Sequence, residues 1–200
     1  MELLAGPGIE AMPAVPTVGI RVRTPFRGML AKRDELLAEL VGCLDQQAIS
    51  DLGHFFLRLN VVDMEGVMDL EVGVTGVVHP GDERVRPGSL PAGNYATLTY
   101  RDHARRANKL LLDWVRDNNI SPDVSTAADG DHFTCRTELY ITDPRTERKK
   151  TRWAVQLLIL TADAALQKSC SASHVSHQPS TPSDDPSEPG DGGWKPMPRH

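Results

Sequence analysis

Three polar side chains that could bind a ligand or take part in catalysis alternate along one short apolar segment. In FTCRTELYI, residues 133–141, Arg136, Glu138 and Tyr140 stand at every second position, so in a strand they share one face. A carboxylate in that setting can bind a ligand or act as a general base, with the phenol as a proton donor. A structural ion pair of Glu138 with Arg136 or Arg58 fits the pattern equally well. Glu138 is the main candidate, because a carboxylate in the middle of a central strand needs a partner.

Other reactive or ligand-binding groups form no pattern in this sequence. Neither GxGxxG nor a P-loop occurs, and no serine, cysteine or histidine stands in a known nucleophile motif. Metal-ligand spacing is also missing around the cysteines and the histidines near the C-terminus, which are Cys43, Cys135, Cys170, His174, His177 and His200. We therefore expect no cofactor and no metal.

Composition and charge narrow the class of protein. The 200 residues are 40% hydrophobic and 24% charged, which is typical of one globular domain. A net charge of −5 argues against direct nucleic-acid binding, because duplex affinity depends on neutralising phosphates. The basic clusters within 101–109 and 145–152 are interpreted as solvated surface. With no 18-residue apolar run and no basic, apolar leader, we expect a cytoplasmic protein without a membrane partner.

The spacing of the hydrophobic residues changes from strand-like to helical and back to strand-like, and this series of changes occurs twice along the chain. Residues 18–22 alternate as a strand, 28–48 follow a helical period, and 54–63 and 68–78 alternate again. Residues 89–102, 102–119, 133–144 and 151–160 repeat that order. This predicts an α+β domain over 17–162, built from two β-α-β-β units with pseudo-twofold symmetry and an antiparallel sheet with both helices on one face. Residues 1–16 are predicted to be flexible because of their prolines, and the Pro/Ser/Asp-rich residues 163–200 to be disordered.

Strand alternation also predicts which side chains face a ligand cleft. We expect Phe133, Cys135 and Leu139 to pack on the helices. The opposite set of side chains would then line the open face of the sheet, where a groove forms between the two halves. Phe56 and Tyr95 are expected beside Glu138. The candidate ligand-binding residues are Glu138, Tyr140, Tyr95, Phe56, Arg58, Arg136 and Trp153.

Several segments together resemble the GyrI-like small-molecule-binding domain, which also serves as the effector-binding part of AraC-type and multidrug-sensing regulators. The matching pieces are MDLEVGV, LPAGNYATLTYRD, LLDWVRDNNI, and TELYITDPR followed by TRWAVQLLI. The resemblance covers residues 17–161 and implies two β-α-β-β units with a ligand cleft between them. It also implies that Glu138 lies at the bottom of this cleft, with Tyr140 at the matching aromatic position. No helix-turn-helix pattern flanks the domain, so a stand-alone form is expected.

Three functions follow from the resemblance and the residues. The first is binding of apolar or cationic aromatic small molecules in the cleft around Glu138. The alternative is a hydrolase that opens strained, cyclopropane-type electrophiles, with Glu138 and Tyr140 as catalytic residues. A second alternative is a protein-interaction role like that of gyrase inhibitors. A small-molecule ligand is the expected partner.

Overall fold

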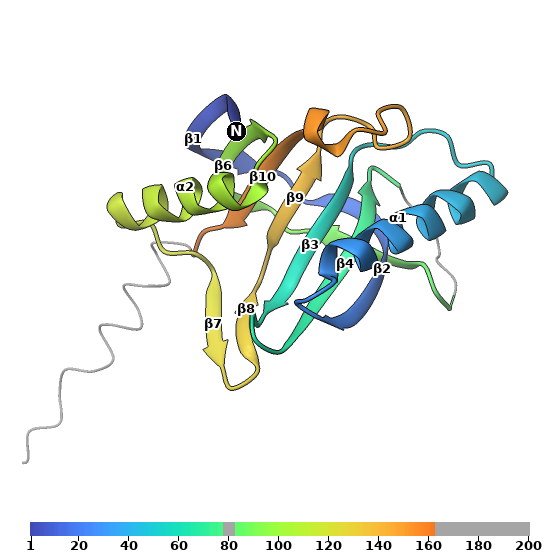
Figure 1. Cartoon of the computed structure of the whole chain (residues 1–200). Coiled ribbons are helices and arrows are strands. Elements are labelled where there is room, and N and C mark those ends of the chain that lie inside the picture. The colour runs from blue at the N-terminus through green and yellow to red at the C-terminus, as the bar shows by residue number, and fades with distance from the viewer. Residues whose placement is uncertain (78–82, 163–200) are drawn as a thin grey trace, which may run out of the picture.

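The computed structural model describes residues 1–77 and 83–162 and shows an α+β fold with one large antiparallel sheet (Figure 1). The predicted disordered tail lies outside the described residues. The elements in chain order are β1 (Glu2–Met12), β2 (Val15–Pro25), α1 (Met29–Gln46), β3 (Phe55–Val62), β4 (Val67–Thr75), β5 (Arg86–Leu90), β6 (Gly93–Arg101), α2 (Ala104–Asp117), β7 (Val124–Ala127), β8 (Gly130–Phe133), β9 (Arg136–Tyr140), a short 3₁₀ turn (Lys150–Arg152) and β10 (Ala154–Leu160).

The sheet confirms the predicted duplication. Its strand order is β1-β6-β10-β9-β3-β4-β2-β5. The three strands of the second unit, β6-β10-β9, mirror the three of the first, β2-β4-β3, and the two units join where β9 pairs with β3. A pseudo-twofold axis therefore passes between these two central strands, which places the middle of β9 near the centre of the molecule.

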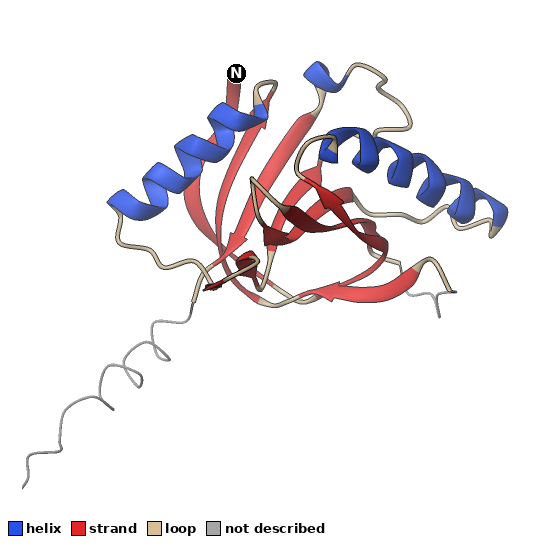
Figure 2. Cartoon of the chain, turned by 60° about the horizontal axis from the view of Figure 1, so that its bottom comes forward, coloured by secondary structure: helices blue, strands red, loops and turns tan. Residues whose placement is uncertain are grey.

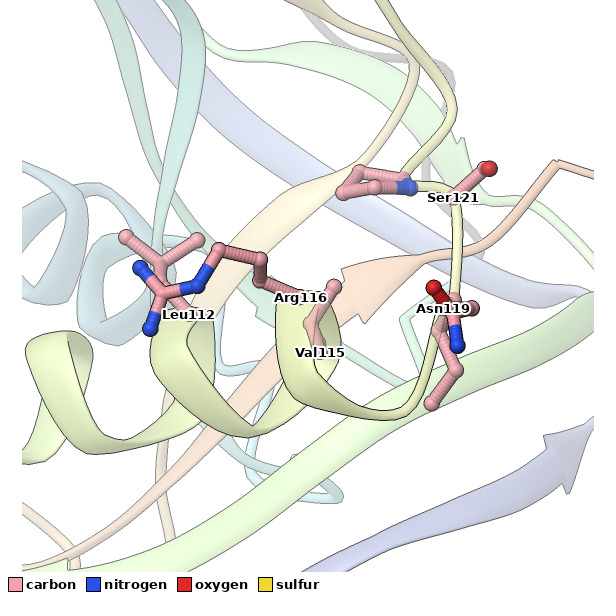
Figure 3. A pocket seen from close by; sticks show the side chains of 7 residues that line it. Leu112, Val115, Arg116, Asn119 and Ser121 are labelled. Carbon is pink, nitrogen blue, oxygen red and sulfur yellow. The ribbon is translucent and has the colours of Figure 1, made fainter.

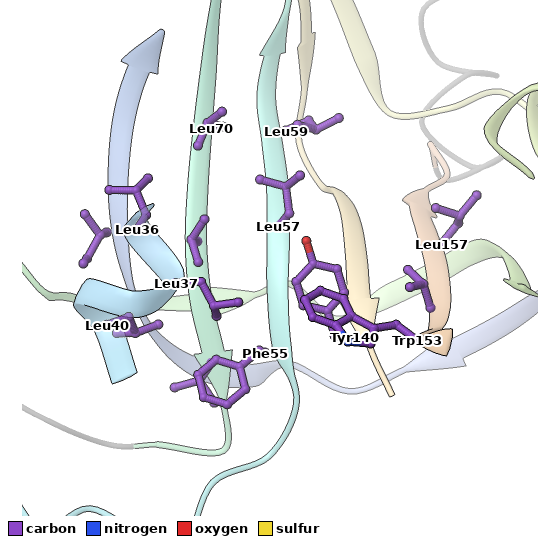
Figure 4. Packing of buried hydrophobic residues seen from close by; sticks show 14 of the residues in the cluster. Leu36, Leu37, Leu40, Phe55, Leu57, Leu59, Leu70, Tyr140, Trp153 and Leu157 are labelled. Carbon is purple, nitrogen blue, oxygen red and sulfur yellow. The ribbon is translucent and has the colours of Figure 1, made fainter. Parts of the chain in front are cut away.

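Both helices pack on the same face of the sheet, as predicted (Figures 1 and 2). Each does so through one apolar stripe. In α1 the buried stripe consists of Arg33, Leu36, Leu37, Leu40 and Leu44, and in α2 of Ala107, Leu111 and Val115. These side chains meet alternate residues of the strands, such as Phe55, Leu57, Leu70 and Leu157, in the larger of two hydrophobic clusters (Figure 4). Burial of this face supplies the main driving force for folding.

The expectation that residues 1–16 are flexible is wrong, because Glu2–Met12 form strand β1. The strand pairs antiparallel with β6 from Glu2 opposite Arg101 to Met12 opposite Gly93. Proline is tolerated on an edge strand, where one side of the backbone needs no hydrogen bond. Pro7 falls at an irregularity in the register between Ala5 and Gly8, which is the other position that accepts proline.

A two-stranded antiparallel ribbon joins the two units on the face of the sheet opposite the helices. Residues 8–12 pair with 93–97, and residues 15–19 pair with 86–90 in the same register. The ribbon is interrupted only at Pro13–Ala14 and Pro91–Ala92, which face each other across it. β1, which precedes β2 of the first unit, thus pairs at the edge of the second unit, and β5, which precedes β6 of the second unit, pairs at the edge of the first. The ribbon formed by these four strands crosses behind the sheet.

The ribbon closes the face that we expected to be open. Beneath it lies a second cluster of buried side chains, made of Phe56, Leu90, Tyr95, Cys135, Leu139, Leu158 and Leu160. Space is tight here: a Cβ atom on Gly73 would overlap the ring of Phe56 and lie 2.7 Å from the Val18 carbonyl oxygen. Cys135 and Leu139 therefore pack under the ribbon and not on the helices, which reverses the predicted facing of β9.

The β-hairpin that follows α2 was also not predicted. Residues 124–127 and 130–133 form the β7–β8 hairpin, which extends β3 through the pairing of Val61 with His132. Gly130, which has φ of 120°, follows the two-residue turn at Ala128 and Asp129. Within the described residues, neither helix is long and apolar enough to span a membrane.

Candidate functional site

Glu138 lies in the middle of β9 and points to the helix side of the sheet. Its neighbours across the two adjoining strands are Leu57 on β3 and Leu157 on β10. Both leucines belong to the cluster beneath the helices. The side chain is half-buried, so the carboxylate forms part of the floor between α1 and α2.

Asn108 of α2 links Glu138 to Arg136. Its side-chain amide donates to Glu138 Oε1 at 3.4 Å and accepts from Arg136 Nη2 at 3.0 Å. Arg136 and Glu138 stand two residues apart on β9, so both reach toward the same turn of α2. Within the described residues, no cation lies within 4.0 Å of the Glu138 carboxylate. The ion pair considered from the sequence is thus replaced by an amide bridge.

On the side of α1, an arginine approaches two aromatic rings. The rings of Tyr140 and Trp153 are 5.1 Å apart and tilted by 52° (Figure 4). The guanidinium carbon of Arg33 lies 5.9 Å from the centre of the Trp153 ring. Arg33 is 8% exposed, and its Nη2 atom donates to Asp34 at 2.8 Å. Asp34 also binds Lys150, so the loop after β9 is tied to α1.

The Tyr140 hydroxyl has no hydrogen-bond partner within the described residues, although its side chain is only 1% exposed. The Trp153 indole differs, because its Nε1 atom donates to the Glu147 carbonyl oxygen at 2.7 Å. Buried polar atoms without partners are uncommon and costly. The nearby Arg33 guanidinium acts on the phenol oxygen, so the hydroxyl proton is the part of this group that lacks a partner among the described residues.

Burial changes the ionisation of this group of residues. It raises the pKa of Glu138, and the nearby Arg33, the amide of Asn108 and Arg136 offset only part of that effect. Burial also raises the pKa of Tyr140, against the opposing influence of Arg33. The pKa of Arg136 is lowered, again by burial. A carboxyl group that resists ionisation and a fully protonated phenol can both donate hydrogen bonds.

The depression above these residues is small. It is lined by Leu59, Asn108, Arg136, Thr137, Glu138, Leu157, Leu158 and Ile159. Its gaps are too narrow to hold a water molecule. Sites for drug-sized ligands measure roughly 300–1,000 Å³. Side chains must therefore move before a ligand of that size can enter.

A wider hollow lies at the C-terminal end of α2 (Figure 3). Its walls come from the last turn of the helix and the segment that follows, including Leu112, Arg116 and Ile120. It opens broadly to solvent and holds no buried polar side chain, so we do not consider it the functional site.

The structure places four of the seven predicted site residues on one face of the sheet. Glu138, Tyr140, Arg136 and Trp153 lie on the helix face. Phe56 and Tyr95 belong to the cluster under the ribbon instead, and Arg58 donates from that same side to the Thr134 carbonyl oxygen at 2.7 Å. The predicted proximity of these three residues to Glu138 is wrong, because adjacent strand positions point to opposite faces.

Sequence reasoning missed Arg33, Asn108 and Tyr100. Tyr100 aligns with Val155 on β10, which in turn aligns with Tyr140, so its ring joins the same row on the helix face. Arg33 lies on the apolar stripe of α1, and Asn108 lies beside that of α2. A polar residue on or beside an apolar stripe was the available signal for both.

Comparisons with known proteins identify the fold. No family model and no curated protein matches the sequence. Among solved structures, the C-terminal domain of EcmrR aligns with 81% of this chain and all of its own, at 15% identity and a TM-score of 0.55. In the EcmrR–DNA complex the match spans 59% of the EcmrR chain and 80% of this one, at 16% identity and a TM-score of 0.58.

Two further structures share the architecture. SAV2435 bound to tetraphenylphosphonium aligns over 78% of this chain and 93% of its own, at 12% identity and a TM-score of 0.51. A hydrolase from Listeria innocua aligns over 80% and 93%, at 10% identity and a TM-score of 0.50. This chain shares the duplicated β-α-β-β fold, with both helices on one face of the sheet, of these solved structures. It is the fold that the resemblance to GyrI-like domains implied.

Proposed function

We propose that this protein is a receptor domain that binds one small, mostly apolar molecule between α1 and α2. The observation that supports this best is the unpartnered Tyr140 hydroxyl beside Glu138, which lacks an ion-pair partner among the described residues. A buried hydroxyl proton without a partner, two residues along the strand from a glutamate that lines a depression, is explained by a ligand that completes its hydrogen bonds. SAV2435, which has the same fold, was solved with a ligand bound.

Entry of the ligand requires the depression to open. Asn108 is the side chain best placed to move, since it extends from α2 to Glu138 and Arg136 in the depression. Opening between the helices would leave the core of the sheet intact, because Leu57 and Leu157 pack from the strands themselves. The site is therefore expected to adapt to its ligand.

The test is a thermal-shift screen of aromatic compounds on the full chain, followed by amide chemical-shift mapping of every hit. We expect shifts concentrated in 104–111 and 136–140. Shifts confined to the hollow around Ile120, or to the cluster under the ribbon, would contradict the proposed site.

A hydrolase is the second candidate, favoured by the carboxyl group of Glu138 in the depression and the phenol of Tyr140 two residues further along the same face of β9. Glu138 would take a proton from an attacking water molecule while Tyr140 donates one to the opening ring of a strained electrophile. The Listeria hydrolase shows that the fold occurs in enzymes. Product analysis of each hit separates the two: turnover that Glu138→Gln abolishes supports the enzyme, and saturable binding without product supports the receptor.

A further inference from the structure

Asn108 covers the depression from the side of α2. The other lining residues that the structure describes come from three strands of the sheet: Leu59 from β3, Arg136, Thr137 and Glu138 from β9, and Leu157, Leu158 and Ile159 from β10. Asn108 alone comes from a helix, one residue after Ala107 of the buried stripe of α2. Its side chain therefore fills the space in which a ligand resting on these strands would have to lie.

The side-chain amide of Asn108 uses both of its polar atoms in this position. Its Nδ2 atom donates to Glu138 Oε1 at 3.4 Å and to the Ala104 carbonyl oxygen, one helical turn earlier, at 3.1 Å. Its Oδ1 atom accepts from Arg136 Nη2 at 3.0 Å. A single amide group thus joins an acceptor and a donor that stand two residues apart on β9. Without Asn108, the Glu138 carboxylate loses a donor and the Arg136 guanidinium loses an acceptor.

Neither sign of charge is in excess around these two groups. Against the effect of burial, Arg33 and Arg136 both favour the ionised form of Glu138, and Glu138 and Asp131 both favour the charged form of Arg136. Two guanidinium groups therefore stand with two carboxylates. A charged ligand between Glu138 and Arg136 would meet one group of its own sign, whereas a neutral ligand with a donor and an acceptor would suit both groups.

We propose that the ligand carries a neutral amide group, which takes the place of the Asn108 amide between Glu138 and Arg136. An N–H group of the ligand would donate to the Glu138 carboxyl group, and its carbonyl oxygen would accept from the Arg136 guanidinium. This rests on the proposed function and assigns the chemistry of the ligand at that site. It departs from the sequence-based expectation of a cationic aromatic ligand.

Binding at this site is an exchange of one amide for another. The gaps of the depression are too narrow to hold a water molecule, so the ligand must take both the space and the hydrogen bonds of Asn108. The side chain of Asn108 is half-buried, and water can satisfy its amide once it turns away from the sheet. The apolar body of the ligand would lie against Leu59, Leu157 and Ile159.

Four planar molecules of nearly the same shape test the idea: benzamide, acetophenone, benzoate and benzamidine. Each is titrated into the full chain at neutral pH while the amide resonances of 136–140 are followed. We expect benzamide to bind about tenfold more tightly than acetophenone, which keeps the carbonyl oxygen and lacks the donor. Benzoate has no donor and protonated benzamidine has no acceptor, so both should also bind more weakly than benzamide. Equal or tighter binding of any of these three would overturn the inference and leave the proposed function standing.

Two variants assign the effect to the exchange. Asn108→Ala removes the internal competitor, and we expect benzamide to bind this variant about tenfold more tightly than wild type. Asn118→Ala is the matched control, because its amide donates to the Trp114 carbonyl oxygen four residues earlier, as that of Asn108 does to Ala104, and does not line the depression. Benzamide affinity that is unchanged or lower in Asn108→Ala would refute the exchange. No binding of any probe at up to about 10 mM, to wild type or to Asn108→Ala, would overturn the proposed function and this inference together.

Discussion

Replacing Glu138 with glutamine should change how the stability of the protein depends on pH. The carboxylate receives one long hydrogen bond, 3.4 Å from the Asn108 amide, and no ion pair within the described residues. Burial therefore outweighs the influence of Arg33 and Arg136 and raises the pKa of Glu138 above its ordinary value of 4.5. Because the folded state then binds a proton more tightly than the unfolded state, stability is fully present below pH 4.5. It is lost as pH rises toward the raised pKa, at about 1.4 kcal/mol per pH unit.

Glutamine keeps the shape and the acceptor for Asn108 without the charge. The two proteins should have similar free energies of unfolding near pH 4, and the variant should become the more stable one as pH rises. The measurement is urea denaturation of both proteins from pH 4 to pH 9. Glu35→Gln, at an exposed position of α1, controls for the change in net charge. A wild type that gains stability relative to the variant with rising pH would refute the reasoning, since the guanidinium groups would then outweigh burial.

Three further substitutions test the packing. Gly73→Ala should destabilise the protein by about 1–3 kcal/mol, because the new methyl group overlaps the ring of Phe56, whereas Gly6→Ala, which meets nothing within 4 Å, should be tolerated; urea denaturation compares them. Leu90→Ala should cost about 2–5 kcal/mol if the ribbon covers a real second core, and a loss below 1 kcal/mol would contradict that arrangement. Tyr140→Phe removes a hydroxyl without a partner among the described residues, so the melting temperature should hold or rise by a few degrees; a marked fall would mean that the hydroxyl is satisfied.

The fold could be predicted from the sequence because its signals are local and repeated. The change between strand and helix periods gives α1 and α2 within two residues of their observed ends, and the repeat gives two units. The role of β1 could not be predicted in this way. Its residues are mostly exposed and show no clear period, so its position depends on pairing with β6, about ninety residues further along the chain.

Strand alternation predicted only part of the candidate site. Alternation places Glu138 and Tyr140 on one face of β9 and Cys135 and Leu139 on the other, and that division is correct. Alternation cannot tell which face the helices cover when both faces carry apolar side chains.

The ribbon determines which face of β9 the helices cover, because it buries the face with Cys135 and leaves the face with Glu138 to the helices. The information for this lay outside the strand, in the two Pro-Ala links at 13–14 and 91–92. Each stands between two strand segments that continue in the same register, so each lets the chain cross from one unit to the other. Because these crossings close the back of the sheet, the ligand of the proposed site would approach Glu138 from the helix side. Under that proposal, Asn108, which α2 places against the carboxylate, is the first side chain that such a ligand would have to displace.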